Sequence, residues 1–154
     1  MGELVAMAKI LILYHTRTGN TEIMAKAIAK GAREIFPYEV DVKRFFEAPK
    51  DLNHYEAIIM GTPNYYHILT HNISEFLEEL AFRKVNLKDK IGAAFGSYGW
   101  SHECPNMLLE VLKNKFEMNV IEPPLFVKYT PDEKGIRECQ EFGKKIANKC
   151  VKCK

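Results

Sequence analysis

Apolar and polar positions along the chain follow two patterns: short unbroken apolar runs, and longer stretches with helical spacing. The short runs are rich in β-branched residues and predict strands buried on both faces, as in a parallel sheet. Two neighbouring prolines, Pro123 and Pro124, restrict the last run to an edge or a short strand. The expected strands of this kind are 10–14, 57–61 and 91–97, with a short last strand within 120–129. Segment 38–44 instead alternates apolar and charged residues, which suits a strand at the edge of the sheet.

Helical periodicity fills the segments between the strands. Apolar residues with that spacing predict a first helix from about Thr21 to Ile35. Asn72 with Glu75 resembles a capping box and predicts the start of a second helix. Pro105 suits the first turn of a third helix, and the run 130–133 (TPDE) gives the last helix an N-cap threonine, a proline and a glutamate. Segment 45–54 is a connection with room for one helical turn.

Strands therefore alternate with helices from one end of the chain to the other. This order predicts a single α/β domain over 1–154, a doubly wound five-stranded parallel sheet with helices on both faces. We expect residues 1–8 and 150–154 to be flexible ends. Ligands of such sheets bind beyond the carboxyl ends of the strands, where the strand order reverses.

The first strand leads into a loop in which nothing is apolar, HTRTGNT at 15–21. A helix follows directly, and its first amides have no partner while its macrodipole favours negative charge. A polar turn with an N-cap is the plainer interpretation. The loop has no Walker lysine and only one glycine, so neither common nucleotide motif fits. We therefore expect a phosphate here, held by backbone amides, by the hydroxyls of Thr16, Thr18 and Thr21, and by the amide of Asn20.

Two further loops, 62–71 and 97–103, leave the same edge of the predicted sheet. The first contains two tyrosines and a histidine, and the second contains Trp100, the only tryptophan. A flat heteroaromatic ring needs stacking partners on its faces and backbone groups at its rim. Aromatic residues that merely cap the core are the alternative. Because three such loops converge, we favour a bound planar ring.

Composition narrows the function classes. The chain has 154 residues, 47% hydrophobic and 27% charged, which suits one globular domain. A formal charge of +2 gives no reason to expect nucleic acid, and no apolar run is long enough to span a membrane. The four cysteines lack a disulfide-framework spacing, so we expect reduced thiols and a cytoplasmic protein.

The first strand, loop and helix resemble the N-terminal signature of flavodoxins at Ile12-Leu13-Tyr14, Thr16, Gly19, Thr21, Ala25 and Ile28. The segments GAAFGSYGWS at 92–101 and VKYTPDEKGIRECQEFGKKIA at 127–147 look like the flavodoxin domain of flavodiiron (A-type) flavoproteins. The likeness covers nearly the whole chain. Two departures are visible: Asn64 to His67 is not the sequence expected there, and no HxExD motif of a diiron domain occurs. A free-standing flavodoxin, or a detached flavodoxin module, is therefore expected.

The resemblance implies a short-chain flavodoxin that binds FMN. It implies that loop 15–21 wraps the phosphate, that Tyr98 and Trp100 flank the isoalloxazine ring, and that 62–66 holds its other side. The implied cofactor-binding residues are His15, Thr16, Arg17, Thr18, Gly19, Asn20, Thr21, Thr62, Pro63, Asn64, Tyr65, Tyr66, Ser97, Tyr98, Gly99 and Trp100.

The implied role is low-potential electron transfer between redox proteins. The expected partners are a ferredoxin-like donor and a reductase or diiron-type acceptor. An NAD(P)H-dependent FMN or quinone reductase on the same fold is the alternative. No catalytic residue is predicted, because the organic chemistry belongs to the cofactor.

Several histidines and cysteines have no assigned role in the expected flavin site. His67 and His71 are too few to hold a metal ion, and we expect them at the surface or at the edge of the bound ring. Cys150 and Cys153 form a CxxC that ends a helix, whereas a reactive pair usually begins one. We therefore favour a tail without a redox role over a disulfide or an intermolecular metal clip. Cys139 is expected in the core.

Overall fold

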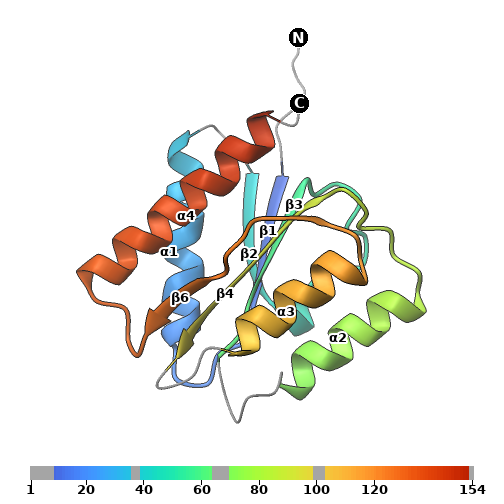
Figure 1. Cartoon of the computed structure of the whole chain (residues 1–154), viewed down its shortest axis with the longest axis horizontal. Helices are drawn as coiled ribbons and strands as arrows, with labels where there is room; N and C mark the ends of the chain where they lie inside the picture. The colour runs from blue at the N-terminus through green and yellow to red at the C-terminus, as the bar shows by residue number, and fades with distance from the viewer. Residues whose placement is uncertain (1–8, 36–38, 64–69, 99–102, 153–154) are drawn as a thin grey trace.

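A computed structural model describes residues 9–35, 39–63, 70–98 and 103–152 of the chain. One sheet lies between two layers of helices, with α1 and α4 on one face and α2 and α3 on the other (Figure 1). The strands are β1 (Lys9–Tyr14), β2 (Glu39–Arg44), β3 (Ala57–Gly61), β4 (Ile91–Tyr98), β5 (Asn119–Val120) and β6 (Leu125–Lys128). The helices are α1 (Asn20–Ile35), α2 (His71–Phe82), α3 (Glu103–Asn114) and α4 (Glu133–Lys152), with a 3-10 turn, η1, at Phe45–Glu47.

All strand pairs are parallel, in the order β2-β1-β3-β4-β5, and β6 also pairs with β4. β5 lies beside the start of β4 and β6 beside its end, so the two together occupy the fifth position of the sheet. The prolines at 123 and 124 interrupt that position, as the sequence predicted. The doubly wound parallel sheet with helices on both faces is confirmed.

Each face of the sheet has its own hydrophobic core. Ile10 and Ile12 pack toward α1 and α4, whereas Leu11 and Leu13 pack toward α2 and α3. This alternation is the two-residue period of a strand, and it explains why the runs are apolar at every position. α1 and α4 approach so closely that a Cβ added at Gly143 would lie 2.0 Å from the Ile28 carbonyl oxygen.

Three helix-end predictions need correction. Asp132, not Thr130, caps α4, because the Gly135 N–H donates to its Oδ1 at 2.8 Å. Asn72 does not cap α2: the N-cap residue is Thr70, and Asn72 contacts the loop after β1 instead. We expected a flexible tail from Cys150, but α4 continues to Lys152 and Cys150 is fully buried, because it extends the apolar stripe of Ile146 and Ala147.

Among the described residues, no helix is both long enough and apolar enough to cross a bilayer. Cys139 lies in the core as expected, and burial raises the pKa of its thiol to about 12. Cys153 and residues 1–8 are outside the described residues, so the predictions made for them stay predictions.

Candidate functional site at the carboxyl edge of the sheet

The β1–α1 loop forms a closed turn at the start of α1. The Thr16 hydroxyl oxygen accepts a hydrogen bond from the Gly19 N–H at 2.9 Å. Gly19 has φ +94°, a conformation that side chains rarely tolerate, and its carbonyl accepts the first helical bond, from Ile23 N–H at 3.1 Å. Gly19 is therefore the N-cap residue. The next three amides, of residues 20 to 22, have no carbonyl one turn earlier and are available to an anion.

Residues of this loop differ in exposure. Thr21 is 1% exposed, Arg17 and Thr18 are exposed, and His15, Thr16, Gly19 and Asn20 are half-buried. A ligand at the helix start would thus meet the hydroxyls of Thr16 and Thr18 from solvent, while Thr21 lies against the protein interior.

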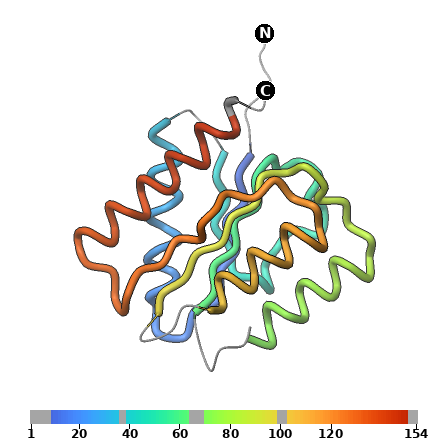
Figure 2. The backbone as a smooth tube through the Cα atoms, viewed as in Figure 1, coloured from blue at the N-terminus to red at the C-terminus, as the bar shows by residue number. Residues whose placement is uncertain are grey.

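Backbone hydrogen bonds carry the sheet pattern past the strand ends and bring three loops together. The His15 N–H donates to the Gly61 carbonyl at 3.2 Å, and the Thr62 N–H donates to the Phe95 carbonyl at 3.0 Å. Figure 2 shows the ends of β1, β3 and β4 side by side at one edge of the molecule. Loop 15–19, Thr62-Pro63 and Ser97-Tyr98 therefore lie at a single site.

Glycine permits the closest approach beneath this edge. A Cβ at Gly96 would lie 2.2 Å from the Thr62 carbonyl oxygen, and a Cβ at Gly61 would lie 2.2 Å from the Phe95 ring. Thr62 itself is fully buried, and its hydroxyl donates to the Pro63 carbonyl at 2.8 Å. The end of β3 is thus held tightly against β4, which gives the edge a rigid floor.

A side-chain contact links the loop to α2. Asn72 Nδ2 lies 3.2 Å from His15 Nδ1. Burial, with smaller effects of Arg17 and Arg44, lowers the pKa of His15, so the neutral ring is favoured at pH 7 and can accept from the Asn72 amide. His71, beside Asn72, pairs with Glu75 at 2.8 Å at the exposed surface of the helix.

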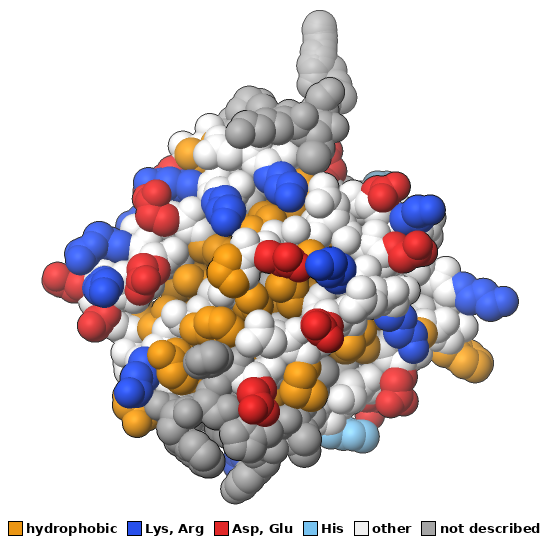
Figure 3. Space-filling model, viewed as in Figure 1, with side chains coloured by type: hydrophobic (Ala, Val, Ile, Leu, Met, Phe, Trp, Pro, Cys, Tyr) orange, Lys and Arg blue, Asp and Glu red, His pale blue; other side chains and the backbone are white. Residues whose placement is uncertain are grey.

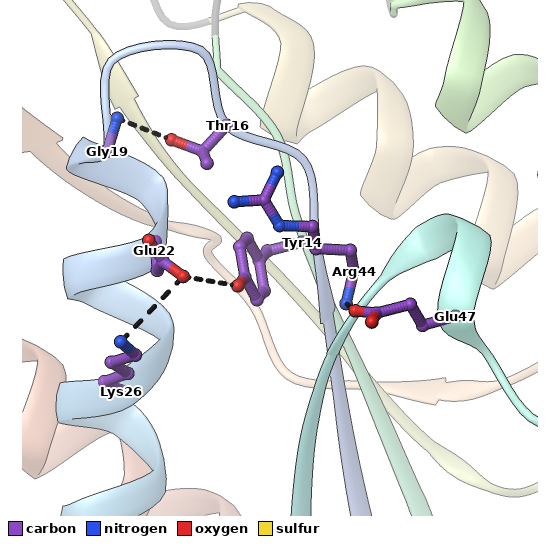
Figure 4. Close-up of polar contacts among 7 residues, drawn as sticks. All are labelled: Tyr14, Thr16, Gly19, Glu22, Lys26, Arg44 and Glu47. Atoms are coloured by element: carbon purple, nitrogen blue, oxygen red, sulfur yellow. Dashed lines mark hydrogen bonds and ion pairs between the residues drawn. The ribbon is translucent and has the colours of Figure 1, made fainter.

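A charged cluster lies below the loop, drawn in Figure 4. The Tyr14 hydroxyl donates to Glu22 Oε2 at 2.6 Å, and Lys26 Nζ lies 3.8 Å from the same carboxylate. The Arg44 guanidinium carbon lies 5.8 Å from the centre of the Tyr14 ring. Burial and the bond to Glu22 raise the pKa of Tyr14, while the bond from Tyr14 lowers the pKa of Glu22.

The structure thus gathers part of the predicted site and leaves part of it untested. His15 to Thr21, Thr62, Pro63, Ser97 and Tyr98 lie at one edge of the sheet. Sequence reasoning missed Glu22, Arg44 and Asn72, because their contacts depend on strand register and helix placement. The remaining predicted residues, Asn64, Tyr65, Tyr66, Gly99 and Trp100, are outside the described residues.

A groove among the described residues lies elsewhere on the molecule. It has a volume of about 710 Å³ along α4 and β6 and is lined by Leu125, Phe142 and several charged side chains. Figure 3 shows apolar side chains between charged ones on this face. We place the candidate site at the carboxyl edge rather than in this groove, because among the described residues the strand ends meet the free amides of a helix there.

Comparison with known proteins identifies a family and several similar structures. The flavodoxin family model matches residues 12–143. A flavodoxin from the domain Archaea superposes with a TM-score of 0.86 and 34% identity, over 93% of this chain and 99% of that one. Flavodoxin 1 from Bacillus cereus superposes with a TM-score of 0.79 and 27% identity, over 94% and 98%.

The chain is also similar to part of larger proteins. It is 33% identical over 147 residues to the anaerobic nitric oxide reductase flavorubredoxin of Escherichia coli K12, which covers 90% of this chain and 29% of that protein. The chain thus spans only about a third of the length of the curated relatives it matches. For two other relatives, the matched share of their length is 36% and 28%.

Proposed function

The chain belongs to the flavodoxin family, and we propose that it binds FMN and carries electrons between redox proteins. Family membership implies a flavin cofactor; the choice of FMN rests on the loop between β1 and α1. That loop offers free helix amides and two accessible hydroxyls, those of Thr16 and Thr18, beside the ends of β3 and β4. This single observation, a built anion site next to the strand ends, carries the proposal.

The residues present suit a phosphorylated flavin. A phosphate dianion needs several donors and a favourable field, and a helix N-terminus supplies both. Gly19 allows the turn because its φ of +94° disfavours side chains, and the space beside it is open, since no atom lies within 4 Å of a Cβ built there. A Thr70 hydroxyl that is buried without a partner among the described residues offers a further polar atom at the start of α2.

In this proposal, each part of the chain has a separate task. Loop 15–21 holds the phosphate, while Thr62-Pro63 and Ser97-Tyr98 support the ring from the two neighbouring strand ends. Tyr98 is backed by Phe126, whose ring lies edge-on at 6.1 Å. Asn64, Tyr65, Tyr66, Gly99 and Trp100 would complete the contacts to the ring. When bound, FMN supplies one- and two-electron chemistry, and the protein supplies orientation and exclusion of water.

The partners and the location follow from the same proposal. Because several relatives contain this domain as about a third of a longer protein, the electron donor or acceptor is either a separate protein or another domain. A ferredoxin-like donor, and a reductase or diiron-type acceptor, fit that role. We place the protein in the cytoplasm.

The proposal is tested by an anaerobic visible spectrum of the purified protein, recorded during addition of NAD(P)H and then dithionite. We expect a flavin spectrum that NAD(P)H leaves unchanged and dithionite bleaches. Direct bleaching by NAD(P)H would indicate the reductase alternative. Absence of flavin absorbance, even after incubation with FMN, would overturn the proposal.

A charge substitution tests the phosphate loop. Thr18→Asp places a carboxylate against the phosphate, so the affinity for FMN should fall at least about tenfold while riboflavin binding changes little. Asn148→Asp adds the same charge at an exposed position of α4 and serves as the matched control. Equal FMN affinity in Thr18→Asp and the wild type would refute the assignment of this loop.

A further inference from the structure

Glu22 is the third residue of α1, counted from its N-cap Gly19. A glutamate at that position commonly turns back and accepts a hydrogen bond from the N-cap amide, which closes a capping box. Here the Gly19 N–H donates to Thr16 instead, and the Glu22 carboxylate accepts from the Tyr14 hydroxyl at 2.6 Å (Figure 4). The carboxylate is thus turned from the start of its own helix toward β1.

The surroundings of Tyr14 make this arrangement stable. Tyr14 is 6% exposed and ends β1, so its ring has little freedom. Arg44 is its register partner on β2, and the guanidinium lies 5.8 Å from the ring centre. Lys26, one turn after Glu22, lies 3.8 Å from the carboxylate. Two cations and one hydroxyl therefore hold and offset the charge of Glu22.

We propose that Tyr14 is a positioning residue that keeps the Glu22 carboxylate off the first amides of α1, so that these amides stay open to the phosphate of a flavin nucleotide. The inference rests on the proposed function and deepens it. A carboxylate and a phosphate dianion compete for the same helix N-terminus, and they repel each other if both approach it. Tyr14 resolves this competition in favour of the ligand and sets the preference for a phosphorylated flavin.

The test compares FMN with riboflavin, which lacks the phosphate, on flavin-free protein. Tyr14→Phe removes only the hydroxyl and frees the Glu22 carboxylate to approach the first amides of α1. We expect the affinity for FMN to fall about tenfold, with riboflavin affinity within about twofold of the wild type, because a helix cap and a charge at a helix end have effects of this size. Inorganic phosphate should also compete less well with FMN in the variant.

A second substitution separates positioning from general damage. Glu22→Ala in the Tyr14→Phe background removes the competing carboxylate, so FMN affinity should return to within about threefold of the wild type. A merely structural role of Tyr14 predicts the opposite, since the double variant would bind no better than Tyr14→Phe alone.

Tyr55→Phe is the matched control. The Tyr55 hydroxyl also donates to a carboxylate at 2.6 Å, that of Asp41, but no helix begins there. The Tyr55→Phe variant should lower stability about as much as Tyr14→Phe and leave the ratio of FMN to riboflavin affinity unchanged. An unchanged ratio in Tyr14→Phe would overturn this inference alone. A wild-type protein that binds neither flavin would overturn the proposed function as well.

Discussion

The two edges of the sheet contain the same hydrogen bond in different surroundings. At the carboxyl edge, Tyr14 donates to Glu22 beside the start of α1; toward the amino edge, Tyr55 donates to Asp41 just before β3. Both distances are 2.6 Å, and burial and the carboxylate raise the pKa of both tyrosines. Only the first pair adjoins free helix amides. The role we propose for Tyr14 and Glu22 therefore depends on the backbone next to the pair, which Tyr55 and Asp41 lack.

The amino edge is satisfied within the protein. Lys90, just before β4, donates from Nζ to the Tyr55 carbonyl at 2.6 Å and to the Asn53 carbonyl at 3.1 Å. A charged side chain therefore satisfies two backbone carbonyls at this edge. At the carboxyl edge, backbone hydrogen bonds hold the strand ends, while the first amides of α1 have no carbonyl partner and Thr18 is exposed. The amino edge is thus closed within the protein, whereas the carboxyl edge combines firmly held strand ends with donors left for a ligand.

The largest effect is expected from Gly96→Ala at the carboxyl end of β4. The new Cβ would meet the Thr62 carbonyl oxygen at 2.2 Å, and neither strand can move without breaking the sheet. We expect a loss of about 3 kcal/mol in the free energy of unfolding, measured by urea denaturation, together with weaker FMN binding.

Gly92→Ala, at the amino end of the same strand, is its control. There the nearest atom is the flexible Met118 sulfur at 3.1 Å, so a loss below about 1 kcal/mol and unchanged FMN affinity are expected. Equal losses in the two variants would contradict the rigid floor we assign to the carboxyl edge.

Lys90→Met should produce an intermediate effect, confined to stability. The methionine keeps the apolar stem, but two carbonyls lose their donor, so about 1–2 kcal/mol of unfolding free energy should be lost. FMN affinity, measured by fluorescence quenching, should not change. Lys88→Met, at an exposed neighbour, is the control. Weakened FMN binding in Lys90→Met would show that the two edges are coupled.

Thr16→Val should affect binding more than stability. It removes the acceptor of the Gly19 N–H but keeps the shape of the side chain. A loss of about 1 kcal/mol in unfolding free energy is expected, with a clear fall in FMN affinity relative to riboflavin. Thr130→Val, exposed before α4, is the comparison. If Thr16→Val and Thr130→Val had the same FMN affinity relative to riboflavin, Thr16 would not belong to the binding site.

The smallest effect concerns the protonation of His15. Its pKa in the folded protein is lowered by burial and by Arg17 and Arg44, so the unfolded chain binds the proton at a higher pH. The contribution of neutral His15 to stability is therefore present above about pH 6.5, the unfolded value, and is lost as the pH falls through the folded pKa.

An NMR titration of the flavin-free protein measures this shift directly. The His15 ring should titrate below the histidines of the urea-unfolded chain, and His15→Gln should flatten the fall in stability between pH 7 and pH 5. A His15 pKa above the unfolded value would contradict the neutral ring and its contact with Asn72.

Local patterns in the sequence were sufficient for much of this protein. Unbroken apolar runs predict β1, β3 and β4, because strands covered on both faces need apolar residues at every position. The loop at 15–21 is recognisable because a hydroxyl-rich segment coincides with a strand-to-helix change. Pro123 and Pro124, which cannot donate to a neighbouring strand, predict a short or edge strand there; its division into β5 and β6 was seen only in the structure.

Contacts between distant segments could be decided only by the tertiary structure. Asn72 carries the signal of a helix cap, yet packing places it against His15, 57 residues earlier. Arg44 meets Tyr14 only because β1 and β2 pair in one particular register, and Glu22 meets Tyr14 only because α1 folds back over the end of β1. Short-range preferences act along the chain, whereas these pairs depend on the free energy of burying two layers of helices on one sheet.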